Sequence, residues 1–353
     1  MKKILALVAE AYGGGGGIAQ TNRDLFEALH QKFEIFVLPR KSNPIQSVLP
    51  KNIQQEQAVM NRLWYAKKAF QVARREKIDF VFCGHLLMAP LARMISKTKN
   101  IPLWVHLYGI DAWEKPSGMV RGAVEHAELV TAISRFTRRK FLSWAGNSPE
   151  KVKILPVTYG EVFQPGSKSE SLVERYGLTG KRVLLTVGRL AAQEKYKGHD
   201  RVIRALPEIL KQVPDAMYVI AGEGDDKKRL ETLAKDQGVS DQVLFIGYIS
   251  EKELPALYRT ADVFVMPSAK EGFGIVFLEA AASGIPVVGG QEGGSLDALA
   301  EGKIGRMIEA DNISQLEEAL LQGLRLPRVK NEAVERFSRA RYAAHALKMA
   351  ENL

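Results

Sequence analysis

The sequence predicts an α/β protein built from two Rossmann-like domains, each a doubly wound parallel sheet. Short runs rich in Val, Ile and Leu alternate with helix-length amphipathic segments almost throughout the 353 residues. Some apolar runs are continuous, as in residues 4–9, which is typical of parallel strands covered on both faces. The rhythm starts twice, on either side of residues 158–180, which contain Pro165 and Gly166 and lack a long apolar run. We therefore expect two facing domains joined by this connection, with ligands bound in the cleft beyond the carboxyl ends of the strands.

The elements follow in order along the chain. In the first half we expect helices that begin near 18, 60, 86 and 134, and strands near 3–9, 33–38, 79–83, 101–106, 129–132 and 152–155. In the second half we expect helices near 198–212, 225–237, 251–260, 275–283 and 313–323, and strands near 182–187, 216–221, 243–246, 262–266, 286–288 and 305–308. The domains are expected at 1–160 and 161–335. The last segment, 336–353, is expected to be a helix that caps the second domain or crosses back to the first.

Composition limits the class of protein. A lone Cys83 excludes a disulfide within one chain and a cysteine-based zinc site, and it indicates a reducing compartment. The apolar run at 4–9 is shorter than the roughly 7 to 15 residues of a signal-peptide core. No apolar run approaches the ~18 residues of a membrane span. We expect a cytoplasmic protein that is soluble or peripheral on the cytoplasmic face of a membrane.

The positive charge is concentrated in the first half. Residues 1–170 carry 25 Lys and Arg against 14 Asp and Glu, whereas residues 171–353 carry 25 against 26. A solvated helix face explains such an excess, and so does attraction to a nucleotide, a phosphorylated acceptor or an anionic membrane surface. Aromatic-rich nucleic-acid motifs are absent, so we expect no nucleic-acid partner. The basic clusters are Lys67, Lys68, Arg74, Arg75 and Lys77 in one expected helix, and Arg135, Arg138, Arg139 and Lys140 in another.

Five glycines, residues 13–17, follow the first strand and precede a helix. They formally fit the dinucleotide fingerprint, but the second strand ends in Arg40 and Lys41 where an acid would hold the ribose. NAD is therefore disfavoured, and NADP stays open. Free backbone N–H groups at a helix N-terminus suit a phosphate or a sugar, while a flexible surface loop is the alternative interpretation.

The second half carries charged residues where strands end. Arg189 follows a strand, and Lys197 comes eight residues later just before a helix, which suggests a clamp for a diphosphate. Glu271 lies in a loop before a helix and Glu279 lies inside that helix, so the two carboxylates would meet different parts of one ligand. Taken singly, each of these residues also reads as an ordinary surface or capping charge.

Three segments together carry a resemblance to a known family. They are "VGRL…YKGHD", "EGFGIVFLEAAASGIPVV" and "GYISEKELPALYRTADVFVMPS". In this order and spacing the chain resembles the retaining GT-B glycosyltransferases of family GT4 (glycosyltransferase group 1). The resemblance covers essentially the whole chain and is strongest over residues 182–300.

The resemblance implies an N-terminal acceptor domain and a C-terminal donor domain. The reaction would move a hexose-type sugar from a UDP- or GDP-sugar to a glycan, lipid-linked, phosphorylated or small-molecule acceptor, with retention through a short-lived oxocarbenium-like species. The nucleotide-sugar would be a co-substrate, with no cofactor and no metal, and the sequence contains no D-x-D motif.

The resemblance also assigns residues. Arg189 and Lys197 match the pair on the donor diphosphate, Glu279 the acid on the ribose, and Glu271 the acid beside the donor sugar. The other donor-binding positions are Gly188, the base-lining Tyr248 and Ile249, the backbone of Phe273, Gly274 and Ile275, and the phosphate-closing loop of Gly15, Gly16 and Gly17.

One segment departs from the family pattern. Many relatives place a histidine directly before the glycine after the fourth strand, whereas "VHLYGIDAW" has Tyr108 there. His106 is the nearest histidine and is expected either to reach the donor sugar or to bond within the sheet edge. His85 and Asp111 are expected on the acceptor side.

Three other functions stay open. They are another GT-B reaction, such as a sugar phosphorylase or epimerase; a nucleotide-sugar-binding partner without turnover; and an NADP-binding oxidoreductase.

Overall fold

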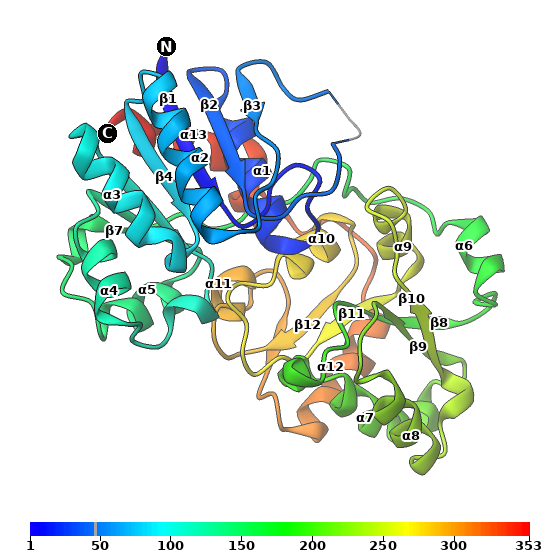
Figure 1. Cartoon of the computed structure of the whole chain (residues 1–353). Coiled ribbons are helices and arrows are strands. Elements are labelled where there is room, and N and C mark those ends of the chain that lie inside the picture. The colour runs from blue at the N-terminus through cyan, green and yellow to red at the C-terminus, as the bar shows by residue number, and fades with distance from the viewer. Residues whose placement is uncertain (46–47) are drawn as a thin grey trace. The chain divides into compact units, whose positions relative to one another are not determined.

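The computed structural model describes residues 1–45 and 48–353 and divides into two compact units (Figure 1). Unit 1 comprises Met1–Thr158 together with Phe337–Leu353, and unit 2 comprises Tyr159–Arg336. The chain leaves unit 1 at Thr158 and returns at Phe337, where the Thr158 hydroxyl donates a 2.7 Å hydrogen bond to the Phe337 carbonyl. Each unit contains a parallel sheet with helices between its strands.

The sheet of unit 1 has seven strands among the described residues, in the order β3-β2-β1-β4-β5-β6-β7. All the recorded pairs are parallel, and β1 lies centrally between β2 and β4. The strands are β1 (Lys2–Val8), β2 (Phe33–Pro39), β3 (Ile53–Gln55), β4 (Phe80–Gly84), β5 (Leu103–Leu107), β6 (Leu129–Ala132) and β7 (Val152–Ile154).

Alternating side chains of β1 enter two apolar clusters, one on each face of this sheet. Leu5 and Leu7 pack with residues of α2, α3, α4 and α5, whereas Ile4 and Val8 pack with residues of α1 and α13. Both faces are therefore covered, which explains why β1 is apolar at every position after its first two lysines. The helices of unit 1 are α1 (Gly16–Leu29), α2 (Arg62–Arg75), η1 (Leu86–Met88), α3 (Ala89–Lys99), η2 (Ile110–Ala112), α4 (Gly118–Glu125), α5 (Arg135–Leu142), η3 (Pro149–Lys151) and α13 (Arg339–Glu351).

The C-terminal segment packs on unit 1. Tyr342 and Ala346 of α13 are buried in the same cluster as Phe26 of α1, and Figure 1 shows α13 close to α1. The Arg339 side chain adds hydrogen bonds to the Asp24 carboxylate at 2.9 Å and to Glu27 at 3.0 Å. Thus α13 completes the face of the sheet that α1 only partly covers.

The sheet of unit 2 has six strands among the described residues, in the order β10-β9-β8-β11-β12-β13. Its recorded pairs are likewise parallel. The strands are β8 (Arg182–Val187), β9 (Ala216–Ala221), β10 (Val243–Gly247), β11 (Val263–Met266), β12 (Val287–Gly290) and β13 (Arg306–Ile308).

The amphipathic helices α7, α8 and α12 pack on one face of the unit 2 sheet around a buried cluster that includes Leu184, Ile203, Leu230 and Leu320. The helices of unit 2 are α6 (Glu170–Arg175), η4 (Ala192–Lys197), α7 (His199–Gln212), α8 (Lys227–Asp236), η5 (Ser240–Gln242), α9 (Leu254–Thr260), α10 (Ile275–Ala282), α11 (Ser295–Ala298), η6 (Ala300–Gly302), α12 (Ile313–Arg325) and η7 (Glu332–Phe337).

Short elements account for most differences from the sequence-based expectation. The connection expected at 158–180 contains α6, which Leu172 anchors as a buried side chain. Strand β3 and helices α4 and α11 were not expected, because three to eight residues are too few to show a periodic pattern. The helix expected from residue 86 begins as η1 and becomes α3 at Ala89. The terminal helix expected from 336 is interrupted, since η7 ends at Phe337 and α13 starts at Arg339.

Each sheet has one point where the direction of strand order reverses. In unit 1 this point lies between β1 and β4, and in unit 2 between β8 and β11. The loops leaving such a pair of strands diverge, so ligands of doubly wound sheets bind beyond these carboxyl ends. Residues after β1, β4, β8 and β11 are therefore the ones to inspect.

Candidate functional site

Arg189 and Lys197, the two expected cations of unit 2, meet at the end of β8, at the reversal point. Both contact the same acid, Glu194 of η4: the Arg189 guanidinium donates to Glu194 Oε1, and Lys197 Nζ lies 2.9 Å from Glu194 Oε2. The Lys197 side chain is 14% exposed and that of Arg189 is 77% exposed. Sequence reasoning did not identify Glu194, although an acid between an arginine and a lysine eight residues apart was a visible signal.

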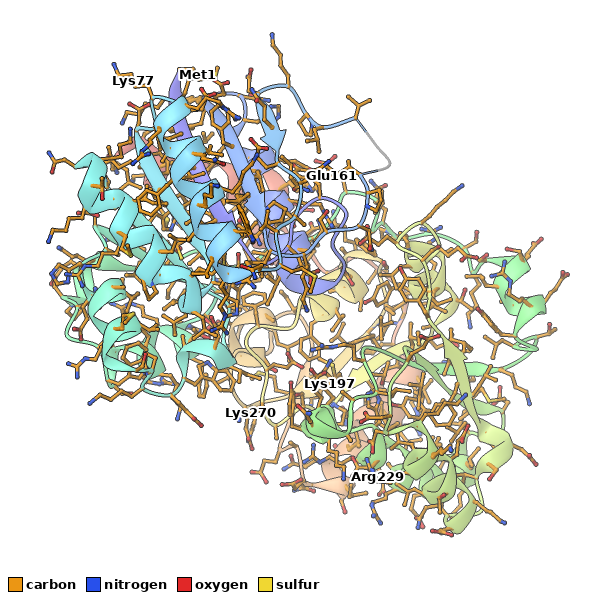
Figure 2. All side chains as sticks on the ribbon, viewed as in Figure 1. Met1, Lys77, Glu161, Lys197, Arg229 and Lys270 are labelled. Atoms are coloured by element: carbon orange, nitrogen blue, oxygen red, sulfur yellow. The ribbon has the colours of Figure 1, made fainter. Side chains whose placement is uncertain are left out.

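Glu271 lies in the same group of charges, on the loop after β11. Burial raises the pKa of its carboxyl group to about 7, while the charges of Lys197 and Arg189 favour the ionised form and Glu194 opposes it. The loops after β8 and β11 also meet through their backbones, since the Ala269 N–H donates to the Tyr196 carbonyl at 2.9 Å. Figure 2 labels Lys197 and Lys270, one on each of these two loops. A carboxyl group that titrates near neutrality beside two cations is a typical feature of functional sites.

Glycines hold these loops against their neighbours at backbone distance. A Cβ at Gly222, after β9, would lie 1.9 Å from the Gly188 carbonyl oxygen, and one at Gly294 would lie 1.9 Å from that of Gly272. The Gly294 N–H also donates to the Glu271 carbonyl at 2.7 Å. Only glycine permits such an approach, so Gly222 and Gly294 fix the loops of Gly188 and Glu271. Their role escaped the sequence reasoning because it depends on contacts between loops distant in the chain.

Glu279, the expected ribose ligand, is 8% exposed on the second turn of α10. The hydroxyl of the fully buried Tyr258 donates to Glu279 Oε2 at 2.8 Å. Burial also raises the pKa of Tyr258, so this phenol remains a proton donor. The bond orients the carboxylate, and it adds Tyr258 to the residues that sequence reasoning missed.

The other donor-binding positions follow strands of the same sheet. Tyr248 comes after β10 and is 71% exposed, with Ile249 partly buried beside it. Phe273 is buried, and Gly274 adopts a left-handed conformation (φ 95°) at the start of α10, where Ile275 begins the helix. The predicted set in unit 2 therefore lies on the loops after β8, β10 and β11 and at the start of α10.

The glycine run in unit 1 divides into two parts. A Cβ at Gly13 would lie 2.2 Å from the Asn43 carbonyl oxygen, whereas none at Gly15, Gly16 or Gly17 would meet an atom within 4 Å. Helix α1 begins at Gly16, two residues earlier than expected, with Gly15 as an N-cap that has no side-chain hydrogen bond. Three glycines thus surround an open helix N-terminus, which is suited to an anion.

The Arg23 side chain of α1 stabilises the backbone of this glycine run through hydrogen bonds. Its Nη1 donates to the carbonyls of Gly14 at 2.8 Å and Ala11 at 3.2 Å, and its Nη2 donates to Gln20 at 2.6 Å. An arginine two turns into a helix carries no sequence signal for such a role.

His106 is enclosed within the sheet of unit 1. It is 1% exposed on β5, and its Nδ1 lies 2.7 Å from the Thr131 hydroxyl of the adjacent strand. Burial lowers the pKa of His106 to about 3, so the imidazole is neutral. Of the two roles that the sequence left open, this geometry favours the hydrogen bond within the sheet, and contact of His106 with a donor sugar stays a prediction.

Tyr108 takes the place of the histidine that many relatives carry. Its hydroxyl donates to Asn22 Oδ1 at 2.5 Å, and the Asn22 amide donates to the Glu10 carbonyl at 2.8 Å. A Cβ at Gly84 would come within 2.9 Å of the same Asn22 oxygen. The ends of β1, β4 and β5 are therefore tied together by uncharged polar groups.

His85 and Asp111 lie on neighbouring loops, after β4 and β5. His85 caps η1 by accepting a hydrogen bond from the Leu87 N–H at 3.2 Å, and burial lowers the pKa of its imidazole. Burial raises the pKa of Asp111 to about 7, and backbone hydrogen bonds from Asp111 itself, Leu86 and Gly109 oppose this rise. The Leu86 contact places the Asp111 carboxyl beside the residue that follows His85.

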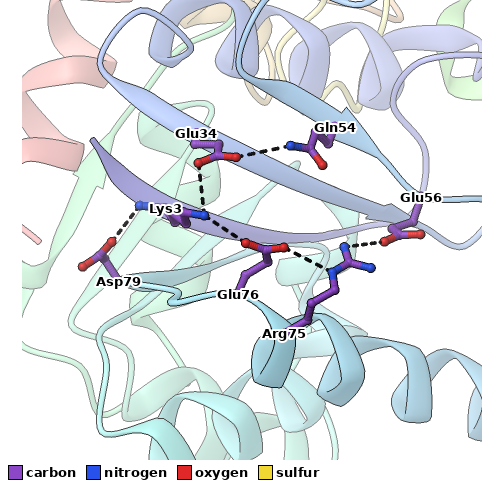
Figure 3. A network of polar contacts seen from close by, with 7 residues as sticks. All are labelled: Lys3, Glu34, Gln54, Glu56, Arg75, Glu76 and Asp79. Atoms are coloured by element: carbon purple, nitrogen blue, oxygen red, sulfur yellow. Dashed lines mark hydrogen bonds and ion pairs between the residues drawn. The ribbon is translucent and has the colours of Figure 1, made fainter.

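Ion pairs neutralise part of the positive excess of unit 1. Lys68 and Arg75 of α2 both pair with Glu56, at 3.0 and 2.9 Å, and Arg75 also pairs with Glu76. Figure 3 shows the adjoining network, in which Lys3 contacts Glu76 and Glu34. The net charge of the α2 surface is therefore smaller than the sequence suggests.

No group of three or more His, Cys, Asp or Glu residues suited to a metal ion occurs within residues 1–45 and 48–353. Among the helices described for the chain, none combines the length and the apolar character needed to span a membrane.

Comparison with known families matches both units. Residues 169–343 match the family model described as "Glycosyl transferases group 1", and residues 15–157 match "Glycosyltransferase Family 4".

The chain is also similar to curated proteins. It is 37% identical over 251 residues to a GDP-mannose-dependent alpha-(1-6)-phosphatidylinositol monomannoside mannosyltransferase of Mycolicibacterium smegmatis, covering 69% of this chain and 65% of that protein. It is 29% identical over 256 residues to a D-inositol 3-phosphate glycosyltransferase of Acidothermus cellulolyticus, covering 65% and 56%. The chain thus spans 65% and 56% of the length of these two curated relatives, less than two thirds of each.

Solved structures agree in fold. The chain superimposes on Anabaena Alr3699/HepE in complex with UDP and glucose with a TM-score of 0.81 and 20% identity, covering 100% of both chains. It superimposes on WaaG, a glycosyltransferase involved in lipopolysaccharide biosynthesis, with a TM-score of 0.66 and 20% identity, covering 99% and 95%. With the two family models and the paired parallel sheets, these findings place the chain in glycosyltransferase family 4 (group 1), with the GT-B fold of two Rossmann-like domains.

Proposed function

We propose that the protein is a retaining glycosyltransferase that moves a hexose-type sugar from a nucleotide-sugar to a glycan, lipid-linked or small-molecule acceptor. The observation that carries the proposal is the group of Arg189, Lys197 and Glu271 at the β8/β11 reversal point of unit 2. Two cations there suit a diphosphate, and a carboxyl group beside them suits the attached sugar.

In this reaction the bond between the anomeric carbon and the diphosphate oxygen breaks, and the nucleoside diphosphate leaves with the electron pair. The acceptor hydroxyl forms the new bond on the same face of the sugar and passes its proton to the departing phosphate oxygen. Arg189 and Lys197 stabilise the negative charge that develops on the leaving group, which is the main electrostatic requirement of the step. Glu271 and Glu279 hold the donor sugar and the ribose, respectively.

To unit 1 we assign the acceptor, with His85 and Asp111 beside it, and we assign an anion to the open amides of Gly15, Gly16 and Gly17. Support for the acceptor assignment comes from the position of both residues beyond β4 and β5 and from the half-buried state of their side chains.

GDP-mannose is the first donor to test, because the name of the 37% identical relative states that it depends on this nucleotide-sugar. Calorimetric titration with GDP-mannose, UDP-glucose and ADP-glucose tests the choice of donor. Hydrolysis and transfer assays with and without EDTA then test the metal-independent mechanism. We expect binding of one GDP- or UDP-sugar and turnover that persists in EDTA. Tight NADP binding without nucleotide-sugar binding would contradict the proposal.

A phosphorylase or an epimerase is distinguished by its products. A phosphorylase would convert the donor when phosphate is added, and an epimerase would convert it without any acceptor. We expect product formation to require an acceptor with a hydroxyl group. A non-catalytic binding protein would titrate the donor without converting it.

The proposal includes peripheral contact of unit 1 with an anionic membrane. Three apolar residues at or just before the start of α2 are exposed to solvent: Met60 by 68%, Leu63 by 82% and Trp64 by 60%. Lys67 Nζ lies 4.7 Å from the centre of the Trp64 ring. Exposed apolar side chains next to a cation favour a membrane interface with anionic lipid. In vesicle flotation we expect more binding to phosphatidylglycerol than to phosphatidylcholine vesicles, and a loss with Leu63→Ser together with Trp64→Ser. Equal flotation with both lipids would contradict this contact.

A further inference from the structure

The Glu194 carboxylate contacts both Arg189 and Lys197, the two cations to which the proposed function assigns the donor diphosphate. One of its carboxylate oxygens accepts from the Arg189 guanidinium, and the other lies 2.9 Å from Lys197 Nζ. The side chains of Glu194 and Lys197 are each only 14% exposed, so this pair is held within the protein surface rather than in solvent. The ion pair between Glu194 and Lys197 is therefore part of the folded structure of the loop between β8 and α7.

The backbone turns Glu194 toward the cations. Its dihedral angles (φ −110°, ψ 27°) interrupt the helical conformation of η4, and its N–H donates to the Ala191 carbonyl at 2.7 Å. On the other side, Gly188 leaves room for the lysine, since a Cβ there would lie 3.3 Å from Lys197 Nζ. Thus the loop bends at Glu194 and brings its carboxylate into contact with both cations.

A carboxylate and a phosphate compete for the same donors. Both present two oxygen acceptors in a plane that matches a guanidinium, and both attract an ammonium group. While Glu194 holds Arg189 and Lys197, the cluster formed with Glu271 carries little net positive charge for an incoming anion. A diphosphate must therefore compete with Glu194 for both cations.

We propose that Glu194 is a resident counter-ion that holds Arg189 and Lys197 in place in the empty site, and that the donor diphosphate displaces it. This inference rests on the proposed function. Its consequence is weaker binding of the nucleoside diphosphate product, because Glu194 competes with the product for both cations. Glu194 thus acts as a positioning residue that limits product retention.

The test compares calorimetric binding of GDP and UDP to the full-length wild type, Glu194→Gln, Lys197→Ala and the double variant. Glutamine keeps the shape of the glutamate side chain and a hydrogen-bonding oxygen while it removes the charge. We expect Glu194→Gln to bind the nucleoside diphosphate about tenfold more tightly, and this gain to disappear in the Lys197→Ala background. In steady-state transfer assays, the donor KM and the kcat should both fall in Glu194→Gln, since release of the diphosphate becomes slower.

Glu318→Gln is the matched control. Glu318 is an exposed acid on α12 that accepts a hydrogen bond from Gln322 of the same helix, so the change removes one charge from unit 2 without contact to the loops after β8 and β11. We expect wild-type affinity from this control. If Glu194→Gln does not fold, as judged by circular dichroism, Glu194→Ala provides the same removal of charge.

The outcomes separate the inference from the proposed function. Unchanged or weaker binding of GDP and UDP to Glu194→Gln, with a loss of binding in Lys197→Ala, would overturn the counter-ion role alone. Unchanged binding in Lys197→Ala would overturn the assignment of the diphosphate to this cluster, and with it the basis of the inference.

Discussion

The two reversal points, β1/β4 in unit 1 and β8/β11 in unit 2, have the same topology but different chemistry. Beyond β8 and β11 the loops bring together a cluster of charged or titrating side chains, Arg189, Glu194, Lys197 and Glu271. Beyond β1, β4 and β5 the structure has open glycine amides and the neutral Tyr108–Asn22 hydrogen bond.

The contrast shows that the fold supplies a place and the loops supply the chemistry. A group of charges is suited to a ligand that keeps its negative charge through the reaction, as a nucleoside diphosphate does. An edge of backbone amides and uncharged side chains is suited to close approach without a strong electrostatic preference. The predictions below test this division of roles, from the largest expected effect to the smallest.

Removal of the buried cation should have the largest effect. Lys197→Ala is expected to lower kcat/KM for sugar transfer by about 10²- to 10³-fold, because it removes one of the two cations that we assign to the leaving diphosphate. Lys195→Ala is the matched control, since Lys195 is an exposed lysine on the same short helix. Initial rates of nucleoside diphosphate release measure both. Equal losses in the two variants would show that Lys197 has no special role.

The contribution of Glu271 to the stability of unit 2 should be larger at acidic than at neutral pH. Its folded-state pKa is raised from 4.5 to about 7, so the protonated form contributes stability that is fully present below about pH 4.5 and is lost as the pH rises toward about 7. Glu271→Gln should remove this loss. Allowing for its partial exposure, we expect the variant to gain about 2 kcal/mol over the wild type above about pH 7, and to match it near pH 4.5.

Hydrogen exchange resolved by peptide is the measurement for Glu271. All four tryptophans (residues 64, 104, 113 and 144) lie in unit 1, so their fluorescence does not follow unit 2. Protection of the β8 and β11 peptides should diverge between the variant and the wild type as the pH rises. A constant difference at all pH values would contradict the raised pKa.

Two glycines of one run should respond in opposite ways. Gly15→Ala places its Cβ in open space and should leave stability nearly unchanged, yet lower transfer about tenfold by blocking approach of a ligand to the amides. Gly13→Ala should lower the free energy of unfolding of unit 1 by about 1 to 3 kcal/mol, because φ is 78° there and the Cβ meets the Asn43 carbonyl. Transfer rates and tryptophan-monitored urea unfolding separate the two effects. Full transfer activity in Gly15→Ala would remove the glycine loop from the site.

The smallest effect is expected at the pair that anchors α13. Arg339→Gln should cost unit 1 about 1 kcal/mol, because Asp24, with 3% side-chain exposure, loses its charged partner while Arg339 itself is already about one third exposed. Lys32→Gln breaks the exposed ion pair between Lys32 and Glu351 of α13. This change should alter the free energy of unfolding by less than about 0.5 kcal/mol. Tryptophan fluorescence in urea reports both. An equal cost for the two variants would argue against a special role for the Asp24–Arg339 pair.

Much of the fold was predictable because the long strands and helices carry strong periodic patterns. The expected strands and most helices agree with the structure to within a few residues. The misses are β3, α4, α6 and α11, which are too short for a period and depend on packing for their existence.

The candidate site was predictable where it follows the ends of strands. Arg189, Lys197 and Glu271 were identified because charged residues directly after apolar runs are a local signal, and the structure brings them together. Glu194 and Tyr258 were missed because their importance arises from contacts formed in three dimensions. His106 shows the converse. Its position near the end of a strand suggested access to a ligand, but its side chain is buried in the structure.

A crystal structure of the protein with GDP or UDP bound tests the central claim most directly. We predict diphosphate oxygens at about 3 Å from Lys197 Nζ and from the Arg189 guanidinium, with the Glu194 carboxylate moved away from both cations. A diphosphate bound elsewhere, with Glu194 still paired to Arg189 and Lys197, would contradict it.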